Sequence, residues 1–138
     1  MKKFELTTDS IKINGVTLYR IKSLIDFEDV KAGDLGGYVE KEENLSQYGS
    51  AWVSDNAFVL GNARVSDNAD YIYLKGFGSH SRSTTMFREK SGNICVSCGC
   101  FSGTLEEFEN KVKETHGNNK FAREYLALVE AAKIHFEV

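Results

Sequence analysis

The sequence predicts a protein of the α+β class, mostly β, with a short β-solenoid between β-hairpins and a helical hairpin at its C-terminal end. Three residue types return every six positions in the central segment. They are Ala51, Ala57, Ala63 and Ala69, then Val53, Val59 and Val65, and finally Asn56, Asn62 and Asn68. A period of six fits neither a helix nor a flat sheet, but it is typical of short strands joined at tight corners.

Length and composition limit the class of protein. With 138 residues, the chain has room for one domain or for two small lobes that share a core. No stretch approaches the roughly 20 apolar residues of a membrane span. The N-terminal sequence MKKFELTTDS also lacks the apolar region of a secretory signal. We therefore expect a cytoplasmic protein without a membrane partner.

Residues 1–32 are predicted to form an N-terminal hairpin that caps the solenoid. Alternating apolar residues flank Asn14-Gly15, the pair favoured in a two-residue type I′ turn. Residues 21–32 fit either a short helix or an irregular path.

Residues 33–70 are predicted to form the solenoid, in about two turns of three six-residue segments each. The glycines at its start permit positive φ, but they lack the Lys-Ser/Thr pair of a phosphate-binding P-loop. Two turns bury little core and leave strand edges exposed at both ends. We therefore expect the flanking segments to cover the ends and the protein to form a homo-oligomer.

Residues 71–138 are predicted to form a second β-hairpin followed by two helices. The hairpin turns at Ser91-Gly92-Asn93. Thr104 and Glu107 have the spacing of a capping box, which opens a helix that Gly117 ends. A second helix with its own apolar stripe follows, so we expect a helical hairpin.

The best candidate site is the polar stretch that follows the solenoid. Residues 71–103 carry four basic residues against Glu89 alone, a net charge of +3 in a chain whose total is −3. Such a small positive island suits a small anionic ligand better than a nucleic-acid polymer. Hydroxyls, an imidazole, guanidinium groups and aromatic rings are gathered here, in Ser79, His80, Arg82, Ser83, Thr84, Thr85, Arg88, Tyr73 and Phe77.

These residue types predict a site for a phosphorylated, nucleotide-like ligand. Arg82 is the expected main anion contact, because a guanidinium can hold a phosphate bidentately. Hydroxyls can donate to the phosphate oxygens, and aromatic rings can stack on a base. The alternative is a polar loop whose Ser and Thr side chains satisfy their own backbone. We assign no catalytic residue and no cofactor.

Three cysteines, Cys95, Cys98 and Cys100, lie within six residues and raise two alternatives. Together with His116 they could bind zinc, because Cys-x2-Cys is a ligand spacing. Cys100 and His116 could also act as a nucleophile and its base. However, strand alternation would point Cys95 and Cys98 to opposite faces, and no second Cys-x2-Cys follows. We therefore expect reduced thiols without a metal and a packed His116.

The central repeats also carry a family resemblance. GDLGGYVEKEENLSQYGSAWVSDNA followed by GNARVSDNA resembles the hexapeptide-type β-solenoid proteins of bacteria and their phages, the YdcK-like repeat group. The resemblance covers about residues 16–70 and implies a left-handed solenoid. Some solenoids with this period are acyltransferases that work as trimers, whereas many members of the group have more repeats than this chain.

The C-terminal part resembles a module of phage and prophage proteins, in the stretches GFGSHSRSTT and ICVSCGCFSGTLEEFENKVKETHG. This resemblance implies a phage setting and supplies no catalytic residue. The function expected is therefore a non-enzymatic phage protein that sequesters a nucleotide-type ligand in the infected bacterial host and so counters antiviral defence signalling. The alternatives are an inhibitor that binds a host protein and an acyltransferase-like enzyme.

Overall fold

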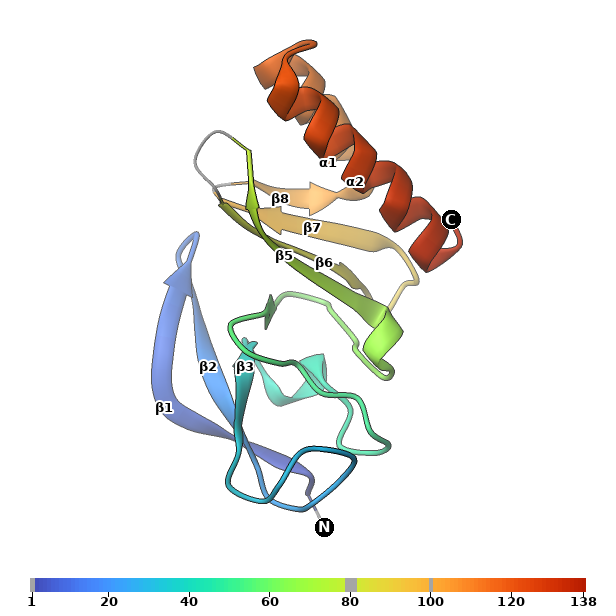
Figure 1. The fold of residues 1–138 in the computed structure, drawn as a ribbon. Helices are drawn as coiled ribbons and strands as arrows, with labels where there is room; N and C mark the ends of the chain where they lie inside the picture. The colour runs from blue at the N-terminus through green and yellow to red at the C-terminus, as the bar shows by residue number, and fades with distance from the viewer. Residues whose placement is uncertain (1, 79–81, 100) are drawn as a thin grey trace. The chain divides into compact units, whose positions relative to one another are not determined.

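The computed structural model describes residues 2–78, 82–99 and 101–138, and at Arg82 the backbone alone. The chain divides into two compact units, Met1–Asp70 and Tyr71–Val138. In the described part of the chain, the strands form two four-stranded sheets with the orders β1-β2-β3-β4 and β5-β6-β7-β8 (Figure 1). None of the described helices combines the length and the apolar character that a membrane span requires.

The first unit begins with a long β-hairpin. β1 (Phe4–Ile13) and β2 (Val16–Ser23) pair antiparallel, and β2 pairs in turn with β3 (Leu35–Val39). The turn between β1 and β2 has positive φ at both Asn14 (51°) and Gly15 (84°), as a type I′ turn requires. The predicted hairpin around Asn14-Gly15 is therefore confirmed, whereas its predicted role as the cap of a solenoid is not.

The predicted solenoid is wrong. Within residues 51–70, all of which are described, the only strand is β4 (Phe58–Val59), two residues that pair in parallel with β3. An isolated parallel bridge joins Leu45 to Val65, and both parallel pairings connect residues twenty positions apart. These short contacts extend an open, mixed sheet and do not close into coils. The observed class is α+β, mostly β, with two sheets and two C-terminal helices in the described chain.

The six-residue period specifies burial and not strand pairing. Ala69, the last member of the alanine series, is exposed and lies in η2 (Asn68–Asp70), a short helix like η1 (Glu42–Asn44). Backbone groups here bond to turns and side chains, as when the Trp52 N–H donates to Asn68 Oδ1 at 2.8 Å. The remaining Ala and Val side chains of the repeat are each at most 1% exposed, namely Ala51, Val53, Ala57, Val59, Ala63 and Val65.

Asn44 holds two neighbouring turns of the first unit together. Its side chain is fully buried, and its Nδ2 donates to the carbonyls of Gly61 and Ala63, both at 3.1 Å. Its Oδ1 accepts from the N–H groups of Glu40 and Lys41 at 3.1 and 3.0 Å. One side chain thus satisfies four backbone groups from segments that are far apart in the sequence.

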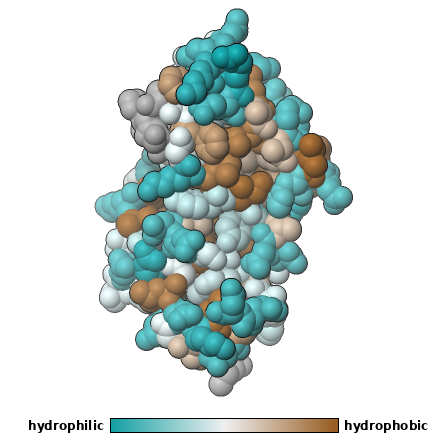
Figure 2. All heavy atoms as spheres, viewed as in Figure 1, coloured by the Kyte–Doolittle hydropathy of each residue, from teal (hydrophilic) through white to brown (hydrophobic). Residues whose placement is uncertain are grey.

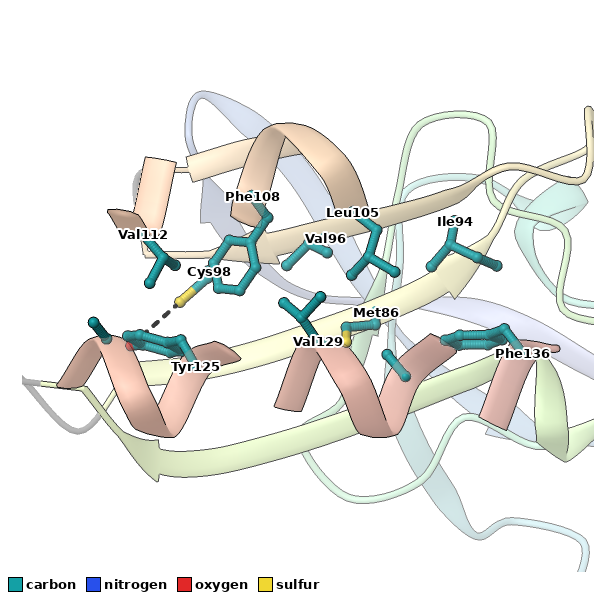
Figure 3. Packing of buried hydrophobic residues seen from close by; sticks show 12 residues of the cluster. Met86, Ile94, Val96, Cys98, Leu105, Phe108, Val112, Tyr125, Val129 and Phe136 are labelled. Atoms are coloured by element: carbon teal, nitrogen blue, oxygen red, sulfur yellow. Dashed lines mark hydrogen bonds between the residues drawn. The ribbon is translucent and has the colours of Figure 1, made fainter. Parts of the chain in front are cut away.

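The second unit is an antiparallel meander with two helices on one face (Figure 1). Its elements are β5 (Tyr71–Phe77), β6 (Arg82–Arg88), β7 (Ile94–Cys98), β8 (Phe101–Thr104), α1 (Leu105–His116) and α2 (Lys120–Phe136). Met86 and Val96 of the sheet pack against Phe108 of α1 and Val129 of α2, all of them buried (Figure 3). Hydrophilic side chains cover the turn between the two helices (Figure 2).

The helix boundaries follow the predicted capping signals. Thr104 Oγ1 accepts from the Glu107 N–H at 3.1 Å, and Glu107 Oε1 accepts from the Thr104 N–H at 2.9 Å. This reciprocal pair confirms the capping box. Gly117 ends α1 with a φ of 61°, and Asn119 caps α2 by accepting from the Ala122 N–H at 3.0 Å. The predicted helical hairpin is therefore confirmed.

Candidate functional site

Strand register divides the predicted ligand residues between the two faces of the β5–β8 sheet. Thr84 lies on the face that the helices cover, where its Oγ1 donates to Cys98 Sγ at 3.1 Å. Its neighbours in sequence, Ser83 and Thr85, lie on the opposite face because side chains alternate along a strand. We call this opposite face the second face. It is the face of the sheet that the two helices do not cover (Figure 1).

A row of four hydroxyl side chains crosses the second face, with one from each strand. Tyr73 of β5 is the register partner of Thr85 in β6, and Thr85 is the partner of Ser97 in β7. Ser97 is in turn the partner of Ser102 in β8. Neighbouring strands lie about 4.8 Å apart, so the hydroxyl row spans roughly 14 Å. Register alone therefore places these four side chains in one line.

The two central hydroxyls of the row are buried without partners. Thr85 and Ser97 are both 0% exposed. Neither Thr85 Oγ1 nor Ser97 Oγ has a hydrogen-bond partner among the described protein atoms. At one end of the row, the Tyr73 hydroxyl and Ser83 Oγ lie 3.3 Å apart and share a hydrogen bond, while Ser102 at the other end is exposed.

A positive charge stands beside the hydroxyl row. Lys75 is the register partner of Ser83 and is exposed near the end of β5. It therefore lies on the second face, two residue pairs along the ladder from Tyr73 and Thr85. The backbone of Arg82 pairs with Phe77 at the start of β6. The predicted residues Ser79 and His80 lie outside the described residues.

The structure gives Phe77 and Arg88 other partners. Phe77 packs against the core beneath the helices, and its carbonyl accepts from the Tyr125 hydroxyl at 3.1 Å. Arg88 lies at the opposite end of β6 from Arg82, where its Nη2 donates to the carbonyl of Phe136 at 3.1 Å. Neither side chain joins Tyr73, Ser83 and Thr85. The second face therefore brings together three of the nine predicted residues.

The cysteines are separated as strand alternation predicts. The partner of Cys95 is Phe87 on the second face, whereas Cys98 is buried in the core, where its Sγ lies 3.7 Å from the Tyr125 hydroxyl (Figure 3). Burial, followed by the hydrogen bond to Glu89, raises the pKa of the Cys95 thiol to about 12. Among the described residues no three His, Cys, Asp or Glu side chains gather as metal ligands would.

His116 lies against aromatic rings at the end of α1. Its ring centroid is 6.1 Å from that of Tyr125, in a stacked arrangement, and 5.9 Å from that of Phe121. His116 is only partly buried and is not a member of the buried core cluster, so it packs against rings without being the core histidine that the sequence predicts. Cys100, its proposed partner in the zinc and nucleophile alternatives, lies outside the described residues.

Sequence reasoning missed three residues of the second face, namely Lys75, Ser97 and Ser102. Lys75 entered the charge count, but it was not assigned to the site. Ser97 and Ser102 lie in strands that the sequence places apart from the polar stretch. Following the strand register from Thr85 across two more strands, to Ser97 in β7 and then to Ser102 in β8, would have found the two serines.

Comparison with known proteins gives a partial match. No family model matches the chain. Over 68 residues the chain is 40% identical to a protein of Escherichia coli (strain K12) described as the uncharacterized acetyltransferase YdcK. The aligned segment makes up 49% of this chain and 21% of that protein, so the chain spans about a fifth of the relative's length. This identity indicates a relationship of the hexapeptide-repeat type.

Proposed function

We propose that this chain is a non-enzymatic phage protein that binds and sequesters a small phosphorylated ligand of the nucleotide type. In this proposal, removal of the ligand from solution counters antiviral defence signalling in the bacterial host. The phage setting comes from the resemblance of the C-terminal module. Binding itself is argued from the second face of the β5–β8 sheet.

The observation that carries the proposal is that Lys75 lies on the same face of the sheet as the hydroxyl row, near Tyr73. An exposed ammonium at the end of β5 can bind a phosphate through charge-assisted hydrogen bonds. Ser83, its register partner, adds a hydroxyl next to that position. Tyr73 brings both a hydroxyl and a ring on which a base can stack. The second face thus offers a contact for the phosphate, the sugar and the base of a nucleotide.

Calorimetric titration of the full chain with nucleoside monophosphates and diphosphates tests the proposal. Lys75→Ala should weaken binding by roughly ten- to a hundredfold, because a hydrogen bond to a charged group is worth about 1.5–3 kcal/mol. Lys90→Ala is the matched control, since Lys90 is also an exposed lysine but lies in the turn beyond the other end of β6. If the wild-type chain binds no phosphorylated compound, the proposal fails.

The second candidate is an acyltransferase-like enzyme, which the identity with a protein described as an acetyltransferase favours. The two candidates differ in what happens to the bound compound. A sequestering protein returns its ligand unchanged after denaturation, whereas a transferase consumes an acyl donor. Incubation of the chain with acetyl-CoA and candidate acceptors, followed by measurement of free CoA, separates them. Release of CoA over multiple turnovers would favour the acyltransferase-like enzyme over the sequestering protein.

We also propose that the protein self-associates. Large apolar side chains are exposed in each unit: Tyr48 is 84% exposed, Leu35 57% and Ile134 79%. A closed homo-oligomer would cover some of this surface. Light scattering at micromolar concentration should give a mass above 15.4 kDa, the mass of one chain. A strictly monomeric mass would contradict this part of the proposal.

A further inference from the structure

We infer that the solvent side of α2 is the surface through which two copies of this chain associate, with their α2 helices packed antiparallel. The inference rests on the proposed self-association and adds to it the surface and the arrangement of the partner. We call this surface the outer face of α2. It consists of six exposed residues, Lys120, Arg123, Ala127, Glu130, Ala131 and Ile134.

The outer face lies opposite the side that α2 buries in its own unit. Tyr125, Val129 and Phe136 are buried and point into the core of the second unit (Figure 3). An α-helix has about 3.6 residues per turn, which places Ala127 and Ile134, two turns apart, roughly 180° around the helix from that buried side. Ile134 is 79% exposed, so neither the sheet nor α1 covers it.

The companion helix shows that an apolar outer face is not a general feature of this helical hairpin. Both helices contribute buried residues to the same core, but the exposed residues of α1, from Glu106 to Thr115, are all polar or charged. In α2, by contrast, Ala127, Ala131 and Ile134 are exposed between charged residues. An apolar stripe with charges along its borders is typical of a helix that packs against another helix.

The charges at the start of α2 fit a partner better than they fit the helix itself. The N-terminus of a helix favours negative charge, and α1 begins accordingly with Glu106 and Glu107 in its first turn. The first turn of α2 has no acidic residue and carries Lys120 and Arg123. A partner that brings carboxylates to this end of α2 would offset the unfavourable interaction of the two cations with the helix dipole.

The order of the charges along α2 selects an antiparallel second copy. Arg123 lies about one turn before Ala127, and Glu130 about one turn after it. If two copies cross antiparallel at Ala127, Arg123 of each copy comes beside Glu130 of the other, and the aliphatic stem of Lys120 covers Ile134. A parallel pair would instead bring like charges together. The small alanine at the crossing lets the two helices approach closely, and the two-fold symmetry closes the assembly as a dimer.

Both members of the proposed ion pair are accessible to a second copy. The ion pairs of the described helices involve Lys111, Lys113 and Lys133, and Arg123 takes part in none of them. Glu130 pairs with Lys133 of its own copy at 3.3 Å, but 71% of its side chain remains exposed. Its carboxylate can therefore accept from a second cation.

Sedimentation velocity of the full chain tests the apolar part of the interface. The wild type should sediment at micromolar concentration as a species of twice 15.4 kDa, the mass of one chain. Ile134→Ser should weaken the dimer roughly a hundredfold, because each copy loses an apolar side chain that the interface buries. Leu35→Ser is the matched control, since Leu35 is an exposed apolar residue of β3 in the first unit, and it should leave the dissociation constant unchanged.

A charge exchange tests the antiparallel arrangement. Arg123→Glu and Glu130→Arg should each weaken the dimer roughly tenfold or more, since like charges then meet between the two copies. The double variant restores both ion pairs with exchanged signs and should recover most of the wild-type affinity. Circular dichroism checks that the helices remain, which we expect because both positions are exposed. A double variant as weak as the single ones would overturn the arrangement.

The outcomes separate this inference from the proposals made above. A wild-type oligomer that persists in Ile134→Ser overturns the inference, whereas self-association stands and uses another surface. A wild type that is monomeric at every concentration overturns both. Titration of the wild type and Ile134→Ser with nucleoside monophosphates tests the ligand-binding proposal separately, because Ile134 lies in α2 and not on the second face. Failure of both proteins to bind would overturn ligand sequestration and leave the result on the dimer unchanged.

Discussion

Arg88 of β6 anchors the last turn of α2 through Phe136. Its Nη2 donates to the Phe136 carbonyl at 3.1 Å, and its guanidinium carbon lies 5.5 Å from the centroid of the Phe136 ring. The last carbonyls of a helix have no partner within the helix, and they carry a partial negative charge that favours a cation. Arg88 therefore connects the sheet to the helix end and stabilises this unit.

Arg88→Ala should lower the free energy of unfolding by about 1–2 kcal/mol, because it removes a hydrogen bond and a favourable charge at the helix end. Urea denaturation measures the loss. Lys90→Ala is the control and should change stability by less than about 0.5 kcal/mol. Ligand affinity should be the same in both variants. A loss of ligand affinity in Arg88→Ala but not in Lys90→Ala would show that Arg88 contributes to ligand binding.

Arg82→Ala should weaken binding of a phosphorylated ligand by roughly ten- to a hundredfold, on the charge-assisted contact that the sequence predicts. Its thermal midpoint should stay close to that of the wild type, since Arg82 begins the strand. Calorimetry and thermal melting on the same preparation provide the two numbers. Equal affinity in the wild type and the variant would show that Arg82 does not contact the phosphate, and Lys75 would remain as the proposed phosphate contact.

Gly78→Ala should cost more stability than Gly92→Ala, although both glycines have similar positive φ, 84° and 92°. A Cβ at Gly78 would overlap the Tyr125 hydroxyl and lie 2.7 Å from Tyr125 Cζ, whereas a Cβ at Gly92 meets nothing within 4 Å. The shared backbone strain cancels in the comparison, which leaves a steric difference of about 1–3 kcal/mol. Equal midpoints in urea would show that Tyr125 can move away from the strand end.

Cys95 should resist alkylation by iodoacetamide at pH 8 in the native protein, because its pKa of about 12 leaves almost no thiolate. Peptide mass spectrometry after timed quenching measures the rate, and the same reaction in urea is the control. Glu89→Gln should speed the reaction, since Glu89 contributes to the raised pKa. Rapid labelling of Cys95 in the native state would contradict the burial of this thiol.

The raised pKa of Cys95 determines the direction in which stability changes with pH. The Cys95 pKa is raised from 9.0 to about 12 in the folded chain, so between these values the folded state keeps a proton that the unfolded state has lost. Stability must then fall as the pH rises through this window. Cys95→Ala should flatten that part of the curve in denaturation experiments from pH 8 to pH 11.

Local sequence signals predicted the turns and helix ends well. Asn14-Gly15, the Thr104–Glu107 capping box and Gly117 each act through groups that lie within a few residues of one another. Their geometry therefore depends little on the rest of the chain. The same locality explains why the two C-terminal helices could be placed from the sequence.

The central repeat shows why the solenoid could not be predicted correctly from periodicity. Burial of an Ala or a Val every six residues requires that the side chain point inward, and several backbone paths meet that condition. In the path found here, the backbone groups form hydrogen bonds within turns and with side chains such as those of Asn44 and Asn68. A sequence pattern of apolar residues carries no information about that choice.

The second face was only partly predictable for a different reason. Tyr73, Ser83 and Thr85 lie close in sequence, so composition pointed to them. Ser97 and Ser102 join them through strand register, which depends on how the turns close. Composition also grouped Thr84 with its neighbours, whereas alternation along β6 turns it toward the core.

The four hydrogen bonds of Asn44 have a consequence for how the first unit forms. Two of them are local, from the N–H groups of Glu40 and Lys41. The other two reach the carbonyls of Gly61 and Ala63, 17 and 19 residues further along the chain, so these two cannot exist until a loop of that length has closed, which costs chain entropy. Contacts of this kind are made late, after the β1–β2 hairpin, whose residues are close in sequence. In stopped-flow experiments, Asn44→Ala should therefore accelerate unfolding and leave the refolding rate nearly unchanged, the behaviour of a residue that locks the unit only after its transition state has been crossed.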